Sequence, residues 1–183
     1  MNISVLINTY NEEHNIRNCL DSVSWADEII IVDMYSTDNT VAIAQEYPNV
    51  KVFYFENCGY ADPAREFAFK QASSEWVLVL DADEMIPQNL SSEIIAVIND
   101  NKFDAISIPR KNYMFGEEIY CGDWGTESVL RVMRTGAILG FNSAIHSQFY
   151  LLKPEAKVIN LSREFFCIIH FNYTNLEHFL DKS

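Results

Sequence analysis

The sequence is short of basic residues: 13 Lys and Arg stand against 26 Asp and Glu, which gives a formal net charge of −13. With no basic stripe to neutralise phosphates, nucleic acid is disfavoured as a partner. The same charge disfavours adhesion of this segment to an anionic membrane surface. Acidic residues gathered in one cleft could instead hold a cation.

Closely spaced cysteines and long apolar runs are also absent. The four cysteines form no Cys-x-x-Cys pair, which argues against zinc and redox motifs and favours free thiols in a reducing cytoplasm. No apolar run approaches a membrane-spanning length, and Ile3–Ile7 follow the first residues without the basic leader of a signal peptide. We therefore expect a soluble, cytoplasmic segment with one substantial core, or a location at the inner face of the membrane in a longer protein.

The chain is organised around the apolar run Trp76–Leu80, which is followed by Asp81, Ala82 and Asp83. Five unbroken apolar residues are typical of a strand buried on both faces of a parallel sheet. If strand geometry continued past the run, both carboxylates would project to the same side. Carboxylates at the carboxyl end of a central strand lie where open α/β sheets bind ligands, and they suit Mg²⁺ or Mn²⁺. The alternative is a polar loop in which Asp81 caps the next helix.

The first half of the chain alternates predicted strands with predicted helices. The strands are expected at residues 5–7, 28–33, 50–55 and 76–80. Asn11 is a good N-cap for the first helix, and Asp62 with Pro63 opens the third in the preferred order. Alternation with short links predicts a parallel, right-handed α/β sheet.

After Pro87 the pattern changes to one helix and then short strands. The apolar face of the helix consists of Leu90, Ile94, Val97 and Ile98. Strand-like runs follow at residues 105–109, 129–133, 158–161 and 165–171, with glycine turns among them. A capping box at residues 174–177 then starts a helix of about two turns, which is marginal by itself. We therefore expect the chain to be truncated, with the natural protein continuing beyond Ser183.

Acidic residues follow three of the predicted parallel strands, namely Glu12, Asp33 and the pair Asp81 and Asp83. Because parallel strands end at one edge of a sheet, these groups should converge on one crevice. In the alternative interpretation Asp33 and Asp38 only cap helices, and Glu12 only interacts with a helix dipole. That explanation suffices for Glu12 and Asp38, but it does not account for the whole arrangement.

These segments resemble the nucleotide-binding half of the family 2 inverting glycosyltransferases of the GT-A fold. The matching segments are Thr-Tyr-Asn-Glu at 9–12, Val-Asp at 32–33 with Ser-Thr-Asp at 36–38, Ala-Arg-Glu-Phe-Ala at 64–68 and Asp-Ala-Asp at 81–83. Residues 25–29 and 108–113 are similar to the lipopolysaccharide-core β-glucosyltransferase branch, so the resemblance covers nearly all the chain. It implies one GT-A domain over residues 1–183, a mostly parallel sheet flanked by helices, with a nucleotide-sugar-binding half at 1–86 and a β-rich acceptor-side half at 87–183.

The resemblance also implies a donor site. Its expected nucleotide-sugar-binding residues are Thr9, Tyr10, Glu12, Asp33, Arg65, Asp81, Ala82 and Trp124. Asp33 would accept a hydrogen bond from the base, and Arg65 would lie near the base or the diphosphate. Asp81 would meet the ribose or the metal, while Asp83 would hold the Mg²⁺ or Mn²⁺ ion that bridges the diphosphate. Such an ion offsets the negative charge that gathers on the leaving group.

An inverting transfer needs a base opposite the leaving group, to take the proton of the acceptor hydroxyl. Residues 124–134 resemble the acceptor-side segment of the family, which implies Glu127 as that base with Trp124 beside it. Relatives usually carry Asp at this position, so this chain keeps the carboxylate but lengthens its reach. A surface glutamate in a glycine-rich turn is the alternative.

Two histidines compete for the remaining metal position. His146 matches a Val-His-Glu segment of relatives, although Ser147 replaces the acid. His170 follows the apolar residues 167–169, as in the second histidine segment of the family. Either residue could instead be a hydrogen-bonded core histidine.

The leading hypothesis is a metal-dependent inverting glycosyltransferase that moves one sugar from a UDP-linked donor to a surface-glycan or lipopolysaccharide-type acceptor. The Gln-x-x-Arg-Trp signature of processive members is absent, which favours single-sugar transfer. A sugar-nucleotidyltransferase would need a glycine-rich, basic loop after the first strand, and residues 8–11 contain neither glycine nor lysine. A nucleotide-sugar-binding module without catalysis stays open, because acceptor binding could require sequence beyond Ser183.

Overall fold

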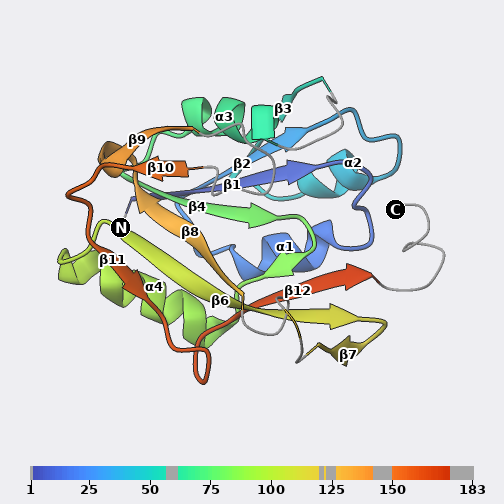
Figure 1. Ribbon diagram of the computed structural model, residues 1–183. Coiled ribbons are helices and arrows are strands. Elements are labelled where there is room, and N and C mark those ends of the chain that lie inside the picture. The colour runs from blue at the N-terminus through green and yellow to red at the C-terminus, as the bar shows by residue number, and fades with distance from the viewer. Residues whose placement is uncertain (1, 57–61, 120–121, 123–126, 142–149, 174–183) are drawn as a thin grey trace.

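The computed structural model describes residues 2–56, 62–119, 122, 127–141 and 150–173 (Figure 1). The strands of the first half are β1 (Ile3–Thr9), β2 (Glu28–Asp33), β3 (Val50–Tyr54) and β4 (Trp76–Asp81). The helices are α1 (Ile16–Ser22), α2 (Thr40–Ala44), α3 (Asp62–Gln71) and α4 (Gln88–Asp100). The remaining strands are β5 (Glu84–Met85), β6 (Ala105–Met114), β7 (Glu117–Glu118), β8 (Ser128–Arg134), β9 (Ile138–Phe141), β10 (Tyr150–Leu152), β11 (Val158–Asn160) and β12 (Ile168–Tyr173).

The main sheet is parallel in the first half of the chain and mixed in the second. Its strand order is β3-β2-β1-β4-β8-β6-β12-β5, with β7 and β11 also paired to β6. Strand β1 is parallel to β2 and β4, and β2 is parallel to β3. Strand β8 runs antiparallel to both β4 and β6. The predicted α/β sheet with a β-rich second half is therefore confirmed, and β4 with β8 forms the seam between the halves.

The side chains of the parallel strands point alternately to the two faces of the sheet, and this divides the core into two layers. Ile3, Val5 and Ile7 of β1 pack with helices α1, α2 and α4 on one face of the sheet. Leu6, which lies between Val5 and Ile7, packs with α3 on the opposite face (Figure 1). Because successive side chains of a strand point to opposite faces, covering both faces requires an unbroken apolar run. The apolar face predicted for α4 is likewise buried, as expected.

Helix α1 begins later than the sequence indicated. The prediction of Asn11 as its N-cap is wrong, because Asn15 precedes the first helical residue, Ile16. Asn11 has a φ of +55°, which asparagine tolerates better than most residues, and its Oδ1 accepts the backbone N–H of Thr37 at 2.8 Å. The asparagine is therefore committed to the loop that follows β2, and this tertiary contact overrides its preference for a helix cap.

The structure also shows the strand expected at residues 165–171 and the state of two cysteines. The strand expected at residues 165–171 is β12, which begins only at Ile168, because the N–H groups of Phe165 and Phe166 close a turn onto the carbonyl of Ser162. Of the four cysteines predicted to be free thiols, Cys19 and Cys167 are free and also buried, and Cys58 and Cys121 lie outside the described residues. Within the described part of the chain, no helix is long and apolar enough to span a membrane.

Glu28 is a buried carboxylate at the start of β2. It accepts hydrogen bonds from Lys51 Nζ at 2.6 Å, Ser4 Oγ at 2.6 Å and Ser73 Oγ at 3.1 Å. Burial raises the pKa of this carboxyl, but the hydrogen bonds, with that from Lys51 the largest, outweigh burial and lower the pKa to about 2. Glu28 therefore stabilises the fold in its ionised form.

Replacing Glu28 by Gln should make stability less sensitive to acid. A carboxyl whose pKa falls from 4.5 to about 2 on folding stabilises the protein above the unfolded value, and the contribution is lost as the pH falls through the folded value. The difference in free energy of unfolding between wild type and Glu28→Gln should shrink by about 2 kcal/mol between about pH 6 and about pH 3. Urea denaturation at the two pH values measures this difference in free energy, with Glu66→Gln as the exposed control. A difference that does not vary with pH would contradict this assignment.

Candidate functional site

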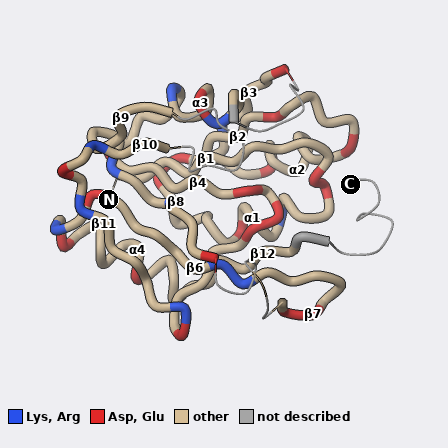
Figure 2. The backbone as a smooth tube through the Cα atoms, in the orientation of Figure 1, with Lys and Arg blue, Asp and Glu red and all other residues tan. Residues whose placement is uncertain are grey.

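The carboxyl ends of β1, β2 and β4 bring several predicted site residues to one edge of the sheet. In the strand register Thr9 lies opposite Asp33, and Asn8 lies opposite Asp81. The acidic turn that follows β4 lies beside this edge (Figure 2). The expected convergence of strand-end groups is therefore present for these residues.

Asp33 is fully buried, and its carboxylate already has protein donors. Oδ1 accepts from Thr9 Oγ1 at 2.9 Å and from Ser36 Oγ at 2.6 Å, and Oδ2 accepts the backbone N–H of Ser36 at 2.8 Å. These bonds tie β1 to the loop after β2, where exposed Tyr35 stacks on Tyr54 with ring centroids 5.5 Å apart. Asp33 therefore shapes this loop, and its contact with a base stays a prediction.

Tyr10 and Glu12 lie in the loop after β1. Tyr10 is 46% exposed, so its ring is accessible at the sheet edge. Glu12 is held on both sides: its carboxylate accepts from Asn15 Nδ2 at 2.8 Å, and its backbone N–H donates to Thr40 Oγ1 at 2.8 Å. The loop is thereby fastened to the starts of α1 and α2.

Strand β4 ends at Asp81, and a turn through Ala82, which is buried, and Asp83, which is half-buried, leads to β5. The strand geometry that would align the two carboxylates does not continue past Asp81. Asp81 binds Arg65 Nη2 through Oδ1 at 2.7 Å and Arg131 Nη2 through Oδ2 at 2.8 Å. Burial raises the pKa of Asp81, but the charges of Arg131 and Arg65 hold it well below its usual range. The carboxylate is therefore ionised and engaged by guanidinium groups through both oxygens.

Arg131 extends this set of ion pairs across the seam. Arg131 Nη2 also binds Glu84 Oε1 at 2.7 Å, and Arg110 Nη1 binds that oxygen at 3.1 Å. Arg110 Nη2 in turn binds Glu127 Oε2 at 2.5 Å. Three cations thus alternate with three carboxylates, and we call this set the ion chain. Its members in order are Arg65, Asp81, Arg131, Glu84, Arg110 and Glu127.

Glu84 is the buried centre of the ion chain. Its side chain is fully buried, and its second oxygen, Oε2, accepts the backbone N–H of Asp81 at 3.0 Å. An ionised carboxylate inside a protein costs several kcal/mol unless opposite charges and hydrogen bonds compensate it. The two guanidinium groups and the backbone N–H provide that compensation.

The sequence reasoning missed Glu84, Arg110 and Arg131. A signal was available, because Arg131 lies between the apolar residues Leu130 and Val132 in the strand expected at residues 129–133. A charged residue at such a position needs a buried partner of opposite sign. Glu84, directly after the Asp-Ala-Asp segment, was the available acid.

Glu127 immediately precedes β8, beside β6. Its backbone carbonyl accepts the N–H of Arg110 at 3.1 Å, so main chain and side chain both join it to this arginine. The side chain is 33% exposed, and Oε1 makes no hydrogen bond to the described residues. Two other predicted site residues, Trp124 and His146, lie outside the described residues.

His170 faces Asp83 across the sheet edge. Its Nδ1 lies 2.6 Å from Oδ1 of buried Asn112, and its Nε2 lies 3.5 Å from Asp83 Oδ1. An amide oxygen only accepts hydrogen bonds, so Nδ1 is the donor to Asn112, and Nε2 is the ring nitrogen that faces Asp83. A carboxylate and an imidazole oriented by a second hydrogen bond fit a divalent cation. Among the described residues no third His, Cys, Asp or Glu completes a metal cluster.

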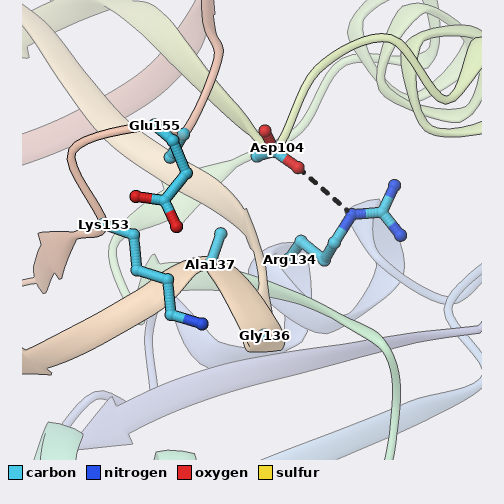
Figure 3. Close-up of a pocket in the computed structure, with 7 residues that line it drawn as sticks. Asp104, Arg134, Gly136, Ala137, Lys153 and Glu155 are labelled. Atoms are coloured by element: carbon cyan, nitrogen blue, oxygen red, sulfur yellow. Dashed lines mark ion pairs between the residues drawn. The ribbon is translucent and has the colours of Figure 1, made fainter.

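A hollow of about 240 Å³ lies at the other end of β4. Its lining residues are Asp104, Arg134, Gly136, Ala137, Lys153, Glu155 and Ala156 (Figure 3). Arg134 pairs in register with Trp76, the first residue of β4, whereas Asp81 is the last. Asp104 Oδ1 and Arg134 Nε lie 3.5 Å apart at its rim. The hollow is therefore separate from the candidate site.

Comparison with known proteins establishes the family. The model of glycosyl transferase family 2 matches residues 4–147, and the chain belongs to this family. The crystal structure of Staphylococcus aureus TarS residues 1–349 has a TM-score of 0.73 at 25% identity, covering 100% of this chain and 63% of that one. Its complex with UDP-GlcNAc has a TM-score of 0.71 at 25% identity, covering 93% and 58%. The predicted family and GT-A fold are confirmed.

Curated relatives agree with this placement. Poly(ribitol-phosphate) beta-N-acetylglucosaminyltransferase TarS of S. aureus is 35% identical over 121 residues, which cover 61% of this chain and 21% of TarS. The glycosyltransferase SunS of Bacillus subtilis is 31% identical over 141 residues, 76% of this chain and 32% of SunS. The lipopolysaccharide core biosynthesis glycosyltransferase LpsC of Rhizobium meliloti is 31% identical over 121 residues, which cover 62% of this chain and 44% of LpsC. The chain therefore spans less than half the length of each.

Replacing Glu84 by Gln should destabilise the fold severely. The change keeps the shape of the side chain but leaves Arg131 and Arg110 without their shared buried carboxylate. The free energy of unfolding should fall by about 3–5 kcal/mol. Glu66→Gln, which breaks an exposed i,i+4 pair with Lys70, should cost at most about 1 kcal/mol. Urea denaturation compares the two variants, and equal losses would refute the role given to Glu84.

Proposed function

We propose that this chain is the donor-binding and catalytic domain of a metal-dependent inverting glycosyltransferase. The reaction moves a single sugar from a UDP-linked donor to a surface-glycan or lipopolysaccharide-type acceptor. The observation that carries the proposal is the approach of His170 Nε2 to Asp83 Oδ1, directly after β4. The family supports sugar transfer, the complex of TarS with UDP-GlcNAc supports a UDP-linked donor, and LpsC supports the acceptor class.

Asp83 and His170 would hold the cation, either Mg²⁺ or Mn²⁺, together with diphosphate oxygens. Asn112 fixes the ring of His170, because its amide oxygen accepts from Nδ1 and leaves Nε2 to bind the metal. When bound, the ion offsets the negative charge that gathers on the departing diphosphate. This proposal uses Asp83 rather than Asp81, whose two oxygens are engaged by Arg65 and Arg131.

Arg65 would add a positive charge on the donor side. Its guanidinium is bound to Asp81, which raises the pKa of Arg65 and fixes the direction of the side chain. We place it near the diphosphate, where a guanidinium pairs well with phosphate oxygens. Thr9, Tyr10, Glu12 and Asp33 would shape the pocket for the nucleoside from the loops after β1 and β2.

Glu127 would act as the base. As the acceptor oxygen forms its bond to the anomeric carbon, the bond from that carbon to UDP breaks and UDP leaves with the electron pair. The proton of the acceptor hydroxyl passes to a carboxylate oxygen of Glu127. Partial exposure and an Oε1 without a hydrogen bond to the described residues suit this role.

Asp83→Asn and His170→Ala should each remove most of the metal dependence of UDP binding. Calorimetry with UDP, with and without Mn²⁺, should show the Mn²⁺-dependent gain in affinity reduced by at least roughly 10- to 100-fold, the usual loss when a group that only orients a metal ligand is removed. Asp21→Asn, on the exposed side of α1, is the control. A folded Asp83→Asn variant with unchanged Mn²⁺ dependence would remove Asp83 from the metal site, and the same result for His170→Ala would make that residue a core histidine.

Glu127→Gln should slow transfer by roughly 10²- to 10⁴-fold, because Gln does not accept the proton. UDP affinity should stay nearly unchanged, because the proposed donor pocket is built from the first half of the chain. Release of UDP from a panel of UDP-sugars measures turnover, with a lipopolysaccharide-core fraction or water as acceptor. Glu117→Gln, at the exposed position of β7, is the matched control. Turnover at the wild-type rate would place the base elsewhere, and loss of UDP binding would place Glu127 in the donor site.

A further inference from the structure

We propose that Arg110 is a positioning residue for Glu127, and that buried Glu84 fixes Arg110 in turn. The inference rests on the proposed function, because it assigns Arg110 a task only if Glu127 accepts the proton. Arg110 itself would touch neither donor nor acceptor. Its role is to keep the carboxylate of Glu127 in one place while the acceptor binds.

Arg110 holds Glu127 through two separate groups. Its Nη2 binds Glu127 Oε2 at 2.5 Å, and its backbone N–H donates to the carbonyl of Glu127 at 3.1 Å. A guanidinium–carboxylate hydrogen bond is among the stronger ones in proteins, because both groups are charged. A glutamate side chain at the start of a strand would otherwise sample several rotamers, and only some could reach the acceptor hydroxyl.

Arg110 is itself anchored from the other side. Its Nη1 binds Glu84 Oε1 at 3.1 Å, and its own carbonyl accepts from Arg163 Nη1 at 2.8 Å. The side chain is only 17% exposed, so the sheet restricts its movement. The planar guanidinium spans two carboxylates at once, which the single ammonium of lysine does less well.

Glu84 links this arrangement to the donor side. Its Oε2 accepts the N–H of Asp81, the last residue of β4, which directly precedes the turn that carries Asp83. The position of the base is thereby set relative to the turn that would hold the cation. A catalytic group misplaced by about 1 Å can lower the rate about 100-fold, so a rigid link between the two sides preserves the rate.

The test measures kcat and KM of the protein at its natural length, with saturating Mn²⁺. The donor is the UDP-sugar that turns over fastest in a panel containing UDP-GlcNAc and UDP-glucose. Arg110→Met should lower kcat by roughly 10- to 100-fold, with KM for the UDP-sugar and affinity for UDP little changed. Arg110→Lys should recover part of the loss, because it keeps a charge but not the planar fork. Arg134→Met, which removes an arginine at the opposite end of β4, should leave kcat unchanged.

A double-mutant cycle separates positioning from other roles. In a Glu127→Gln background, Arg110→Met should lower kcat no further, because the group that it positions has lost its function. If Arg110→Met slows both backgrounds equally, or if neither Arg110 variant folds, the positioning role is refuted. If the wild type releases UDP from no member of the panel, or if Glu127→Gln is as fast as the wild type, the proposed function fails instead.

Discussion

The ionised carboxylate of Glu84 is the constraint on which the seam of the sheet depends. A fully buried charge is tolerated only where opposite charges and donors surround it, and here they come from β4, β6 and β8. Arg131 and Arg110 are therefore held at fixed places on neighbouring strands. Through Nη2 the same two guanidinium groups bind the carboxylates of Asp81 and Glu127, so one buried charge determines the positions of two more.

This arrangement joins two halves of the chain with different architectures. The parallel half supplies the strand ends and loops proposed for the nucleotide, and the mixed half supplies β6, β8 and β12. Antiparallel β8 completes the seam, because it pairs with β4 on one side and β6 on the other. The candidate metal pair crosses the same region, since His170 of β12 faces Asp83 beside β5. The residues proposed for the donor and acceptor sides are thus parts of one packed edge of the sheet.

The sequence was sufficient for the parts that follow local periodicity. Unbroken apolar runs predicted β1, β2 and β4, and the apolar stripe from Leu90 to Ile98 predicted α4. It was insufficient where a distant contact decides the local structure, as at Asn11, whose side chain binds the backbone of Thr37. The ion chain was missed for the same reason, because its pairs join residues far apart in the sequence. Asp33 illustrates a third case: its position was predictable, but its bonds to Thr9 and Ser36 were not.

The most direct test of the account is electron spin echo spectroscopy of Mn²⁺ bound to the protein with UDP. We expect a ¹⁴N coupling from the imidazole of His170 and ³¹P couplings from the diphosphate on the same ion. The nitrogen coupling should disappear in His170→Ala, whereas the phosphorus couplings should remain. A Mn²⁺–UDP complex of the wild-type protein without nitrogen coupling, or one whose coupling persists in His170→Ala, would contradict the assignment of Asp83 and His170 as the metal centre.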